Sequence, residues 1–181
     1  MRVITGSARG RKLKTLEGMD TRPTSDRVKE AVFSAIQFDL PGSVFLDLFA
    51  GSGQMGIEAL SRGAKHAVFV DASPKAIQAV RENLAHCGFA DKAKVAQMDA
   101  QSFLKSTTTR FDLVFLDPPY QQQIIDAVLP AVVQQMAPGG IILCETERNE
   151  QLPEQAGDYA LTKTYFYGKA KITAYRRQEE A

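Results

Sequence analysis

The alternation of strand-like and helix-like segments between residues 44 and 145 constrains the fold more than any other feature of this 181-residue chain. Short apolar runs recur there, and segments with apolar residues at helical spacing separate them. Strands that alternate with helices form parallel sheets with helices on both faces. The sequence therefore predicts an α/β fold with an open, mostly parallel sheet.

Local signals set the expected boundaries of these elements. Ser73-Pro74 opens a helix in the favoured order of cap then proline, and Gly88 ends it. Pro130 lies inside a helical pattern, where we expect a kink or the start of a second helix. Pro-Gly-Gly at 138–140 predicts a turn. The expected strands are 44–48, 67–71, 94–98, 111–116, 141–145, 161–167 and 170–176, the last two as an antiparallel hairpin, and the expected helices are 25–37, 54–62, 74–87, 100–105 and 122–136.

Composition and length are those of one globular domain. The chain is 44% hydrophobic and 24% charged, which is ordinary for a soluble protein. No apolar stretch approaches membrane-spanning length, and the first residues lack the apolar core of a signal peptide. We expect a cytoplasmic, single-domain protein with an N-terminal basic arm (1–23), a leading helix (24–38) and an α/β core (43–177).

Four aspartates stand at the ends of predicted strands: Asp47, Asp71, Asp99 and Asp117. In an open parallel sheet the carboxyl ends of the strands meet at one edge, where ligands bind. Gathered carboxylates repel one another unless a cation or several donors offset them. The expected ligand therefore presents positive charge, hydroxyls or amines. Each of these aspartates, taken alone, could instead cap a helix. Asp99 is the least secure member of the proposed ligand-binding set.

Gly51, Gly53 and Gly56 fit the G-x-G-x-x-G fingerprint, with Asp71 twenty positions after the first glycine. This pattern suits an adenosine-bearing ligand, but by itself it does not distinguish NAD from other ligands that contain adenosine. Asp47 lies four residues before Gly51 and would repel a pyrophosphate, whereas it would attract the ammonium of S-adenosylmethionine. The residues favour S-adenosylmethionine, and an NAD-dependent oxidoreductase is the alternative.

A strand-like run, Phe-Asp-Leu-Val-Phe-Leu, leads directly into Asp117-Pro118-Pro119-Tyr120. The two prolines fix their own φ angles and favour extended geometry before them. A carboxylate, a backbone carbonyl and an aromatic ring are therefore held in a fixed relation. This set suits a planar ligand with an NH₂ group, because it offers two acceptors and one stacking face.

Both ends of the chain are basic, although the net charge is only +1. Neither residues 1–16 nor residues 161–177 contain an acid. Such ends suggest a polyanionic partner, and a pair of solvated tails is the alternative. The basic residues are Arg2, Arg9, Arg11, Lys12, Lys14, Lys163, Lys169, Lys171, Arg176 and Arg177.

Together these motifs resemble a known family. Asp-Leu-Phe-Ala-Gly-Ser-Gly (47–53), Asp71 and Asp-Pro-Pro-Tyr (117–120) are similar to the motifs of S-adenosylmethionine-dependent amino-methyltransferases. Arg-Gly-Arg-Lys-Leu (9–13) and Arg-Pro-Thr-Ser-Asp-Arg-Val-Lys-Glu-Ala (22–31) narrow the resemblance to the RsmD family, guanine-N2 methyltransferases of bacterial 16S ribosomal RNA. The resemblance covers nearly the whole chain.

The resemblance implies a Rossmann-like class I S-adenosylmethionine-dependent methyltransferase fold with a seven-stranded sheet. It implies 16S rRNA as partner. Because a single short domain offers little surface for reading RNA, we expect the substrate to be an assembled or assembling 30S subunit. We expect a monomer without membrane contact, and no metal, because the sequence contains no metal-ligand cluster. The residues alone do not choose among guanine N2, adenine N6 and cytosine N4. A non-catalytic RNA-binding module is a further alternative, which the intact Asp117–Tyr120 motif disfavours.

The resemblance also implies roles for individual residues. Asp47 and the glycine turn would hold the methionine part of the cofactor, Asp71 the ribose, and Asp99 with Ala100 the adenine. Asp117 and the Pro118 carbonyl would accept hydrogen bonds from the guanine amine, and Tyr120 would stack on the base. Residues 22–24 and Arg27 would close over the cofactor. The predicted set is Asp117, Pro118, Pro119 and Tyr120 for catalysis; Asp47, Phe49, Ala50, Gly51, Ser52, Gly53, Asp71, Ala72, Asp99, Ala100 and Thr24 for the cofactor; and Arg9, Arg11, Lys12, Arg22 and Arg27 for RNA.

Overall fold

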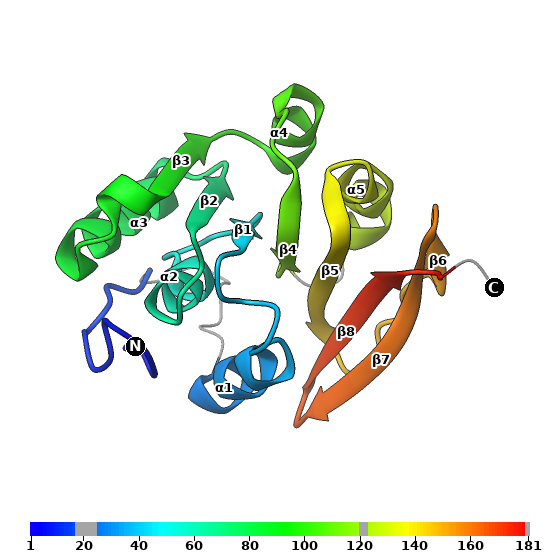
Figure 1. The fold of residues 1–181 in the computed structure, drawn as a ribbon, viewed down its shortest axis with the longest axis horizontal. Helices are drawn as coiled ribbons and strands as arrows, with labels where there is room; N and C mark the ends of the chain where they lie inside the picture. The colour runs from blue at the N-terminus through cyan, green and yellow to red at the C-terminus, as the bar shows by residue number, and fades with distance from the viewer. Residues whose placement is uncertain (17–24, 120–122, 180–181) are drawn as a thin grey trace.

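The computed structural model describes residues 1–16, 25–119 and 123–179. One sheet of eight strands runs through them in the order β3-β2-β1-β4-β5-β8-β7-β6 (Figure 1). The strands from β3 to β5 are parallel, and β8, β7 and β6 continue the sheet in antiparallel pairing. The predicted mostly parallel sheet with a terminal antiparallel hairpin is confirmed.

The elements lie close to their predicted positions. A two-residue strand, β6, makes eight strands where seven were expected. The strands are β1 (Val44–Asp47), β2 (His66–Asp71), β3 (Ala93–Gln97), β4 (Phe111–Leu116), β5 (Met136–Glu147), β6 (Gln155–Ala156), β7 (Tyr159–Tyr167) and β8 (Ala170–Arg177), and the helices are α1 (Asp26–Ala35), α2 (Gln54–Ser61), α3 (Pro74–Cys87), the 3₁₀ turn η1 (Ala90–Lys92), α4 (Ala100–Ser106) and α5 (Ile124–Val133).

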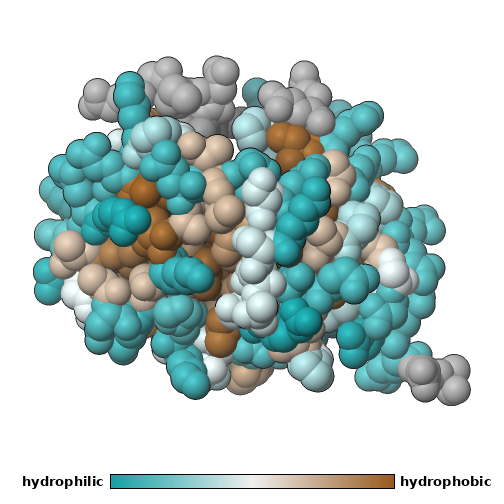
Figure 2. Space-filling view, turned by 90° about the horizontal axis from the view of Figure 1, so that it is seen from above, coloured by the Kyte–Doolittle hydropathy of each residue, from teal (hydrophilic) through white to brown (hydrophobic). Residues whose placement is uncertain are grey.

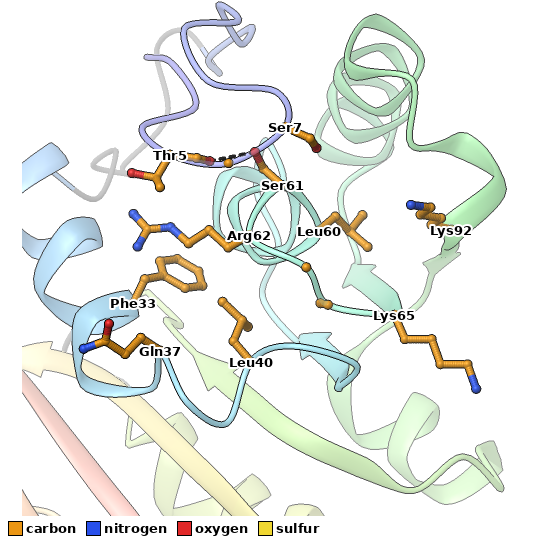
Figure 3. Close-up of a pocket in the computed structure, with 13 residues that line it drawn as sticks. Thr5, Ser7, Phe33, Gln37, Leu40, Leu60, Ser61, Arg62, Lys65 and Lys92 are labelled. Atoms are coloured by element: carbon orange, nitrogen blue, oxygen red, sulfur yellow. Dashed lines mark hydrogen bonds between the residues drawn. The ribbon is translucent and has the colours of Figure 1, made fainter.

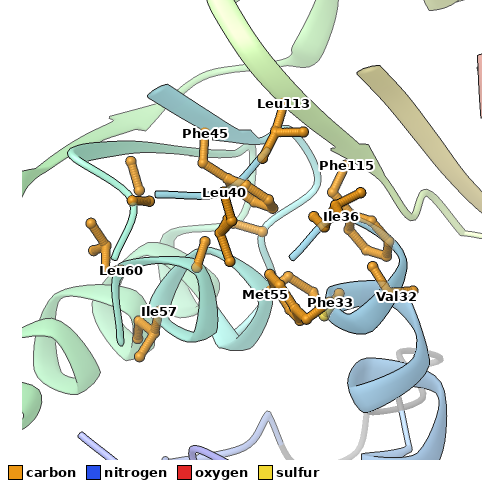
Figure 4. Packing of buried hydrophobic residues seen from close by; sticks show 14 of the residues in the cluster. Val32, Phe33, Ile36, Leu40, Phe45, Met55, Ile57, Leu60, Leu113 and Phe115 are labelled. Carbon is orange, nitrogen blue, oxygen red and sulfur yellow. The ribbon is translucent and has the colours of Figure 1, made fainter. Parts of the chain in front are cut away.

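Two hydrophobic layers cover the two faces of the sheet. Helices α1, α2 and α3 pack on one face, and α4 and α5 pack on the other. Figure 4 shows Phe33 of α1 and Met55 of α2 beside Phe45 and Phe115 of the central strands. The apolar run of β4 is buried along its length because helices lie on both of its faces, as expected of a central parallel strand.

Helix starts follow the capping signals in the sequence. The Ser25 hydroxyl accepts a hydrogen bond from Val28 N, and the Ser73 hydroxyl accepts one from Ala76 N. Gly88 ends α3 in the left-handed conformation. Each cap satisfies a backbone group that the helix leaves unpaired.

One prediction in the region 122–140 is wrong, and another is decided only in part. Pro130 lies within the single helix α5, which ends at Val133, so no second helix starts there, and the alternative of a kink at Pro130 stays a prediction. Residues 138–140 belong to β5 and do not form a separate turn. The register with β4 jumps between the pairs Phe111–Met136 and Leu113–Ile141, so a bulge in β5 absorbs the proline and glycines.

The N-terminal segment folds back on itself and packs onto the body. Arg2 and Lys12 form an antiparallel bridge, while Val3 is buried. Ala8 N donates to the Ser61 hydroxyl at 2.9 Å. A side chain at Gly6 would place its Cβ 1.9 Å from the Ser61 carbonyl oxygen, so only glycine fits this contact with α2.

A buried ionic cluster fixes this segment to α1 and α2. The Glu58 carboxylate accepts hydrogen bonds from Ile4 N (2.8 Å) and Thr5 N (3.1 Å) and from Arg62 Nε (3.2 Å). Lys29 Nζ lies 3.9 Å from Glu58 Oε1 and donates to the Arg2 carbonyl. Burial lowers the pKa of Lys29, and Glu58 counteracts that effect.

Hydrophilic residues cover much of the surface that Figure 2 displays, with hydrophobic ones between them. None of the helices in the described ranges combines the length and the apolar character needed to cross a membrane.

We predict that Glu58→Ala lowers the free energy of unfolding by about 3–5 kcal/mol, because it leaves the buried Lys29 ammonium without its countercharge and two N–H groups of the N-terminal segment without their acceptor. Urea denaturation measures the loss. Glu82→Ala is the matched control, because Glu82 pairs with Lys14 at the surface, where ion pairs contribute little. Equal losses in the two variants would show that the Glu58 cluster does not hold the segment.

Candidate functional site

The candidate site lies at the carboxyl ends of the parallel strands. Strand β1 pairs with β2 on one side and β4 on the other, so the direction of strand succession reverses there (Figure 1). Asp47 is in register with Phe69 of β2 and Phe115 of β4. Open α/β sheets bind ligands at such a reversal.

Backbone hydrogen bonds hold the end of β1 between its neighbours. Leu48 N donates to the Phe115 carbonyl at 3.3 Å, and Ala50 N donates to the Val70 carbonyl at 2.9 Å. The glycine turn that follows is therefore fixed to both β4 and β2. Asp117, one residue beyond β4, lies on the adjoining strand end.

Each glycine of the fingerprint has a distinct physical role. Gly51 and Gly53 have φ angles of +55° and +85°, which L side chains rarely adopt. Gly53 directly precedes α2. A Cβ on Gly56 would lie 2.3 Å from Cε1 of Phe69, so this glycine permits close packing of α2 on β2. A Cβ on Gly51 would meet nothing within 4 Å, so open space adjoins the turn.

Asp47 is a buried carboxylate, 2% exposed, that accepts a hydrogen bond from Gly56 N at 3.0 Å. The contact satisfies an N–H in the first turn of α2, so Asp47 does help to cap this helix. Its predicted role in cofactor binding stays a prediction. Burial raises the pKa of Asp47 to about 7, and the Gly56 hydrogen bond opposes that rise. A nearby cation would favour the ionised form.

Asp71 connects the glycine turn to the start of α3. Its Oδ2 accepts from Gly51 N and its Oδ1 accepts from Ser73 N, both at 2.9 Å. A carboxylate has about four acceptor sites, so two hydroxyls of a ligand could still donate to it. Ala72 is exposed beside it.

Asp99 caps α4, as the capping alternative anticipated. It accepts hydrogen bonds from Ser102 N (2.9 Å) and from the Ser102 hydroxyl (2.6 Å). The same hydrogen bonds lower its pKa. Met98 N donates to the Asp71 carbonyl, which places the start of α4 near the end of β2. The adenine role of Asp99 and Ala100 stays a prediction.

The Asp-Pro-Pro segment follows the end of β4. Asp117 is partly buried, Pro118 is buried and Pro119 is exposed. Tyr120, Arg22 and Thr24 fall outside the described residues, so their predicted roles stay predictions.

The predicted RNA-binding residues lie on other elements. Arg9, Lys12 and Arg27 are exposed, and Arg27 is in the first turn of α1. Arg11 is exposed and donates to the His86 carbonyl, near the C-terminus of α3. The structure thus places the arm cations over α2 and α3 rather than at the end of β4.

Sequence reasoning missed Asn83. Its side-chain amide donates to the Ser52 carbonyl at 2.9 Å and to the Lys14 carbonyl at 3.1 Å, and its oxygen accepts from Lys14 N. The residue therefore joins the N-terminal segment to the glycine turn. The available signal was a polar residue beside Leu84 on the apolar face of the helix.

A hollow of about 780 Å³ lies at the opposite edge of the sheet, where β1 and β2 begin. Figure 3 shows Thr5 and Ser7 on one side of it and Phe33 and Leu40 on the other. None of the predicted catalytic or cofactor residues that the structure describes lines it. The candidate site is therefore located by the strand ends and not by this hollow. Within the described part of the chain, no group of three or more His, Cys, Asp or Glu side chains could hold a metal ion.

Comparison with known sequences gives matches along the whole chain. The family model described as "Conserved hypothetical protein 95" matches residues 1–176. The protein YlbH of Bacillus subtilis (strain 168) is 43% identical over 183 residues, covering 98% of this chain and 100% of that protein. The Ribosomal RNA small subunit methyltransferase D of Escherichia coli (strain K12) is 32% identical over 182 residues, covering 99% of this chain and 91% of that protein.

Solved structures confirm the predicted fold class. The Escherichia coli protein yhhF has a TM-score of 0.89 at 30% identity, covering 99% of both chains. An RNA methyltransferase from Salinibacter ruber, solved in complex with S-adenosyl-L-homocysteine, has a TM-score of 0.70 at 19% identity, covering 88% of this chain and 96% of that chain. The Rossmann-like methyltransferase fold is therefore shared.

We predict that Asp47→Asn becomes more stable relative to the wild type as the pH rises from 5 to 8. The pKa of Asp47 rises from an ordinary 3.8 to about 7 on folding, so the folded wild type binds more protons between these values. Its stability therefore falls as pH rises through that window, by as much as about 4 kcal/mol for a shift of roughly three units. Asparagine has no charge to lose. Urea denaturation from pH 5 to pH 8.5 measures the difference, and parallel stability curves would contradict the prediction.

Proposed function

Because this chain belongs to the RsmD family, we propose that it transfers a methyl group from S-adenosylmethionine to the exocyclic N2 amine of a guanine in 16S ribosomal RNA. One observation supports this most directly. The Asp117-Pro118 acceptor pair follows β4, and the buried Asp47 and the glycine turn follow the adjacent strand β1. An amine and a cationic methyl donor would therefore meet at neighbouring strand ends.

The residues at this edge fit the cofactor. The buried Asp47 carboxylate suits a positively charged group, and the space beside Gly51 leaves room for a ligand against the turn. Asp71 retains acceptor capacity for ribose hydroxyls, and the start of α4 would receive the adenine through Asp99 and Ala100. When bound, S-adenosylmethionine supplies a methyl group already activated on a sulfonium.

The buried Asp47 argues against a dinucleotide at the same turn. A pyrophosphate would bind where backbone N–H groups face the ligand at the N-terminus of α2. Here the Gly56 N–H is already donated to Asp47. A second anion beside this buried carboxylate would meet a like charge in a medium of low dielectric constant.

Asp117 and the Pro118 carbonyl act on the substrate amine. They would accept hydrogen bonds from the two N–H groups of the guanine amine, so that the nitrogen lone pair points at the incoming methyl group. They would also stabilise the positive charge that develops on the nitrogen. Positioning then supplies most of the catalysis, because the methyl group is already activated.

The amine of a guanine that is stacked within an RNA helix cannot reach the carboxyl end of β4. We therefore propose that the base is unstacked and turned into the site, at a cost of a few kcal/mol. Stacking on Tyr120 would return about 1–3 kcal/mol.

The substrate we propose is 16S rRNA within an assembled or assembling 30S subunit, because a chain of 181 residues offers little surface for reading RNA sequence. The relatives that carry the name Ribosomal RNA small subunit methyltransferase D support this substrate class. We propose that the protein acts as a monomer in the cytoplasm.

We predict that Asp117→Asn lowers the rate of methyl transfer by about 10²–10³-fold while leaving S-adenosylmethionine affinity nearly unchanged. The reason is that the amine loses its charged acceptor at the moment when positive charge develops. Single-turnover transfer to small subunits and titration calorimetry measure the two quantities.

Asp112→Asn is the matched control, because Asp112 lies near the opposite end of the same strand and its carboxylate accepts a hydrogen bond from Val44 N. It should retain transfer. Lost cofactor binding in Asp117→Asn would remove Asp117 from the substrate role, and binding of NADH in place of S-adenosylmethionine by the wild type would refute the proposed function.

A further inference from the structure

The turn between β7 and β8 lies at the same edge of the sheet as the candidate site. Strand β8 is antiparallel to β5, with Ala170 opposite Glu147 and Arg176 opposite Ile141. The turn at Gly168 and Lys169 therefore lies beyond the carboxyl end of β5 (Figure 1). Strand β5 is the neighbour of β4, and β8 is the neighbour of β5. Strand β8 therefore lies two interstrand spacings, about 10 Å, across the sheet from β4, which ends one residue before Asp117.

An exposed aromatic ring stands at this turn. Phe166 is 53% exposed, and within the described residues only Phe38 is a more exposed large hydrophobic side chain. The Arg148 guanidinium carbon lies 4.6 Å from the centroid of the Phe166 ring. Arg148 is itself fixed, because its Nη1 donates to the Gly168 carbonyl and its backbone N donates to the Lys169 carbonyl.

Cations surround the ring. Lys171 is directly opposite Phe166 in the β7–β8 register and donates to the Glu150 carbonyl. Lys169 is exposed in the turn. On the other face of the hairpin, Lys163 Nζ lies 4.8 Å from the centroid of Tyr165. Two acids lie near these cations, since Glu147 is opposite Ala170 in the β5–β8 register and Lys171 donates to the Glu150 carbonyl. The three cations Arg148, Lys169 and Lys171 therefore outnumber the acids by one.

We infer that Arg148, Phe166, Lys169 and Lys171, here called the hairpin tip, bind an unpaired nucleotide of the RNA strand that delivers the target base. The base stacks on Phe166, and Arg148 and Lys169 bind the adjoining phosphates. Aromatic rings among cations are the general means by which proteins bind single-stranded nucleic acid. A single exposed ring among charges is a poor match for an apolar protein partner. The inference deepens the proposed function and rests on it, since the strand held here is the substrate strand.

The position of the hairpin tip beside the candidate site explains how a nucleotide bound there would assist methyl transfer. A base turned out of its stack must be kept out while the methyl group is transferred, and a second stacked nucleotide on the same strand holds the RNA open. The N-terminal segment packs on α2 and α3, so its cations would contact phosphates on the other side of the site.

The test uses the absence of tryptophan from the chain. Phe166→Trp and Phe38→Trp each introduce a single fluorophore, and Phe38, 89% exposed, lies at the opposite edge, before β1. Titration with a 12-nucleotide oligouridine should quench the indole emission of the Phe166→Trp variant, because stacking brings a base onto the indole. The emission of the Phe38→Trp variant should stay unchanged. No quenching in the Phe166→Trp variant, or equal quenching in both variants, would overturn the inference.

Affinity gives a second readout. Phe166→Ala should weaken oligouridine binding by about 5- to 150-fold, the factor that corresponds to one base stack, and Phe38→Ala should not. Replacing both Arg148 and Lys169 by Gln should reduce the salt slope of binding by about two, whereas the matched pair Lys65→Gln and Lys92→Gln at the opposite edge should leave it unchanged. Equal effects of the paired variants would overturn the inference.

Methyl transfer to small subunits separates this inference from the proposed function. If the wild type methylates 16S rRNA and Phe166→Ala matches Phe38→Ala in kcat/KM, the hairpin-tip inference is wrong and the proposed function stands. If the wild type methylates no rRNA while oligouridine still quenches the Phe166→Trp variant, the proposed function fails and the tip still binds RNA.

Discussion

The hydrogen bond from the Gly56 N–H to the buried Asp47 carboxylate joins the end of β1 to the first turn of α2, and the candidate site depends on it. The bond holds an acid in the interior at the reversal of strand order, with β2 and β4 on either side. The glycine turn between the two residues is then closed by Asp71 through Gly51 N. A buried carboxylate of raised pKa and an open glycine turn together make an edge that favours a positively charged ligand.

The N-terminal segment is part of this arrangement and not an appendage. Glu58 binds its backbone from within α2, and Asn83 connects it to the Ser52 carbonyl in the glycine turn. Phosphate contacts made by Arg9 or Lys12 would therefore act on a segment that touches the glycine turn, where we propose that the cofactor binds. RNA affinity and cofactor affinity are expected to depend on one another through this connection.

The sequence predicted the alternation of elements, because it follows from local periodicity. It also predicted that Asp47, Asp71 and Asp117 stand at the carboxyl ends of parallel strands, and that a ligand binds at this edge stays a prediction. It failed at residues 138–140, where pairing of Met136 with Phe111 outweighed the local turn preference. It also missed Glu58 and Asn83, whose partners lie 54 and 69 residues away in the chain. Long-range polar contacts leave no periodic signal, and the capping role of Asp99 could not be separated from a ligand role by spacing alone.

The central claim is that this edge of the sheet methylates a guanine amine of 16S rRNA. Transfer of a labelled methyl group from S-adenosylmethionine to small subunits that lack the modification, followed by nucleoside analysis and mapping, tests it most directly. The account predicts label in N2-methylguanosine at one nucleotide of 16S rRNA. Label in an adenine or a cytosine, or no label from protein that binds the cofactor, would contradict it.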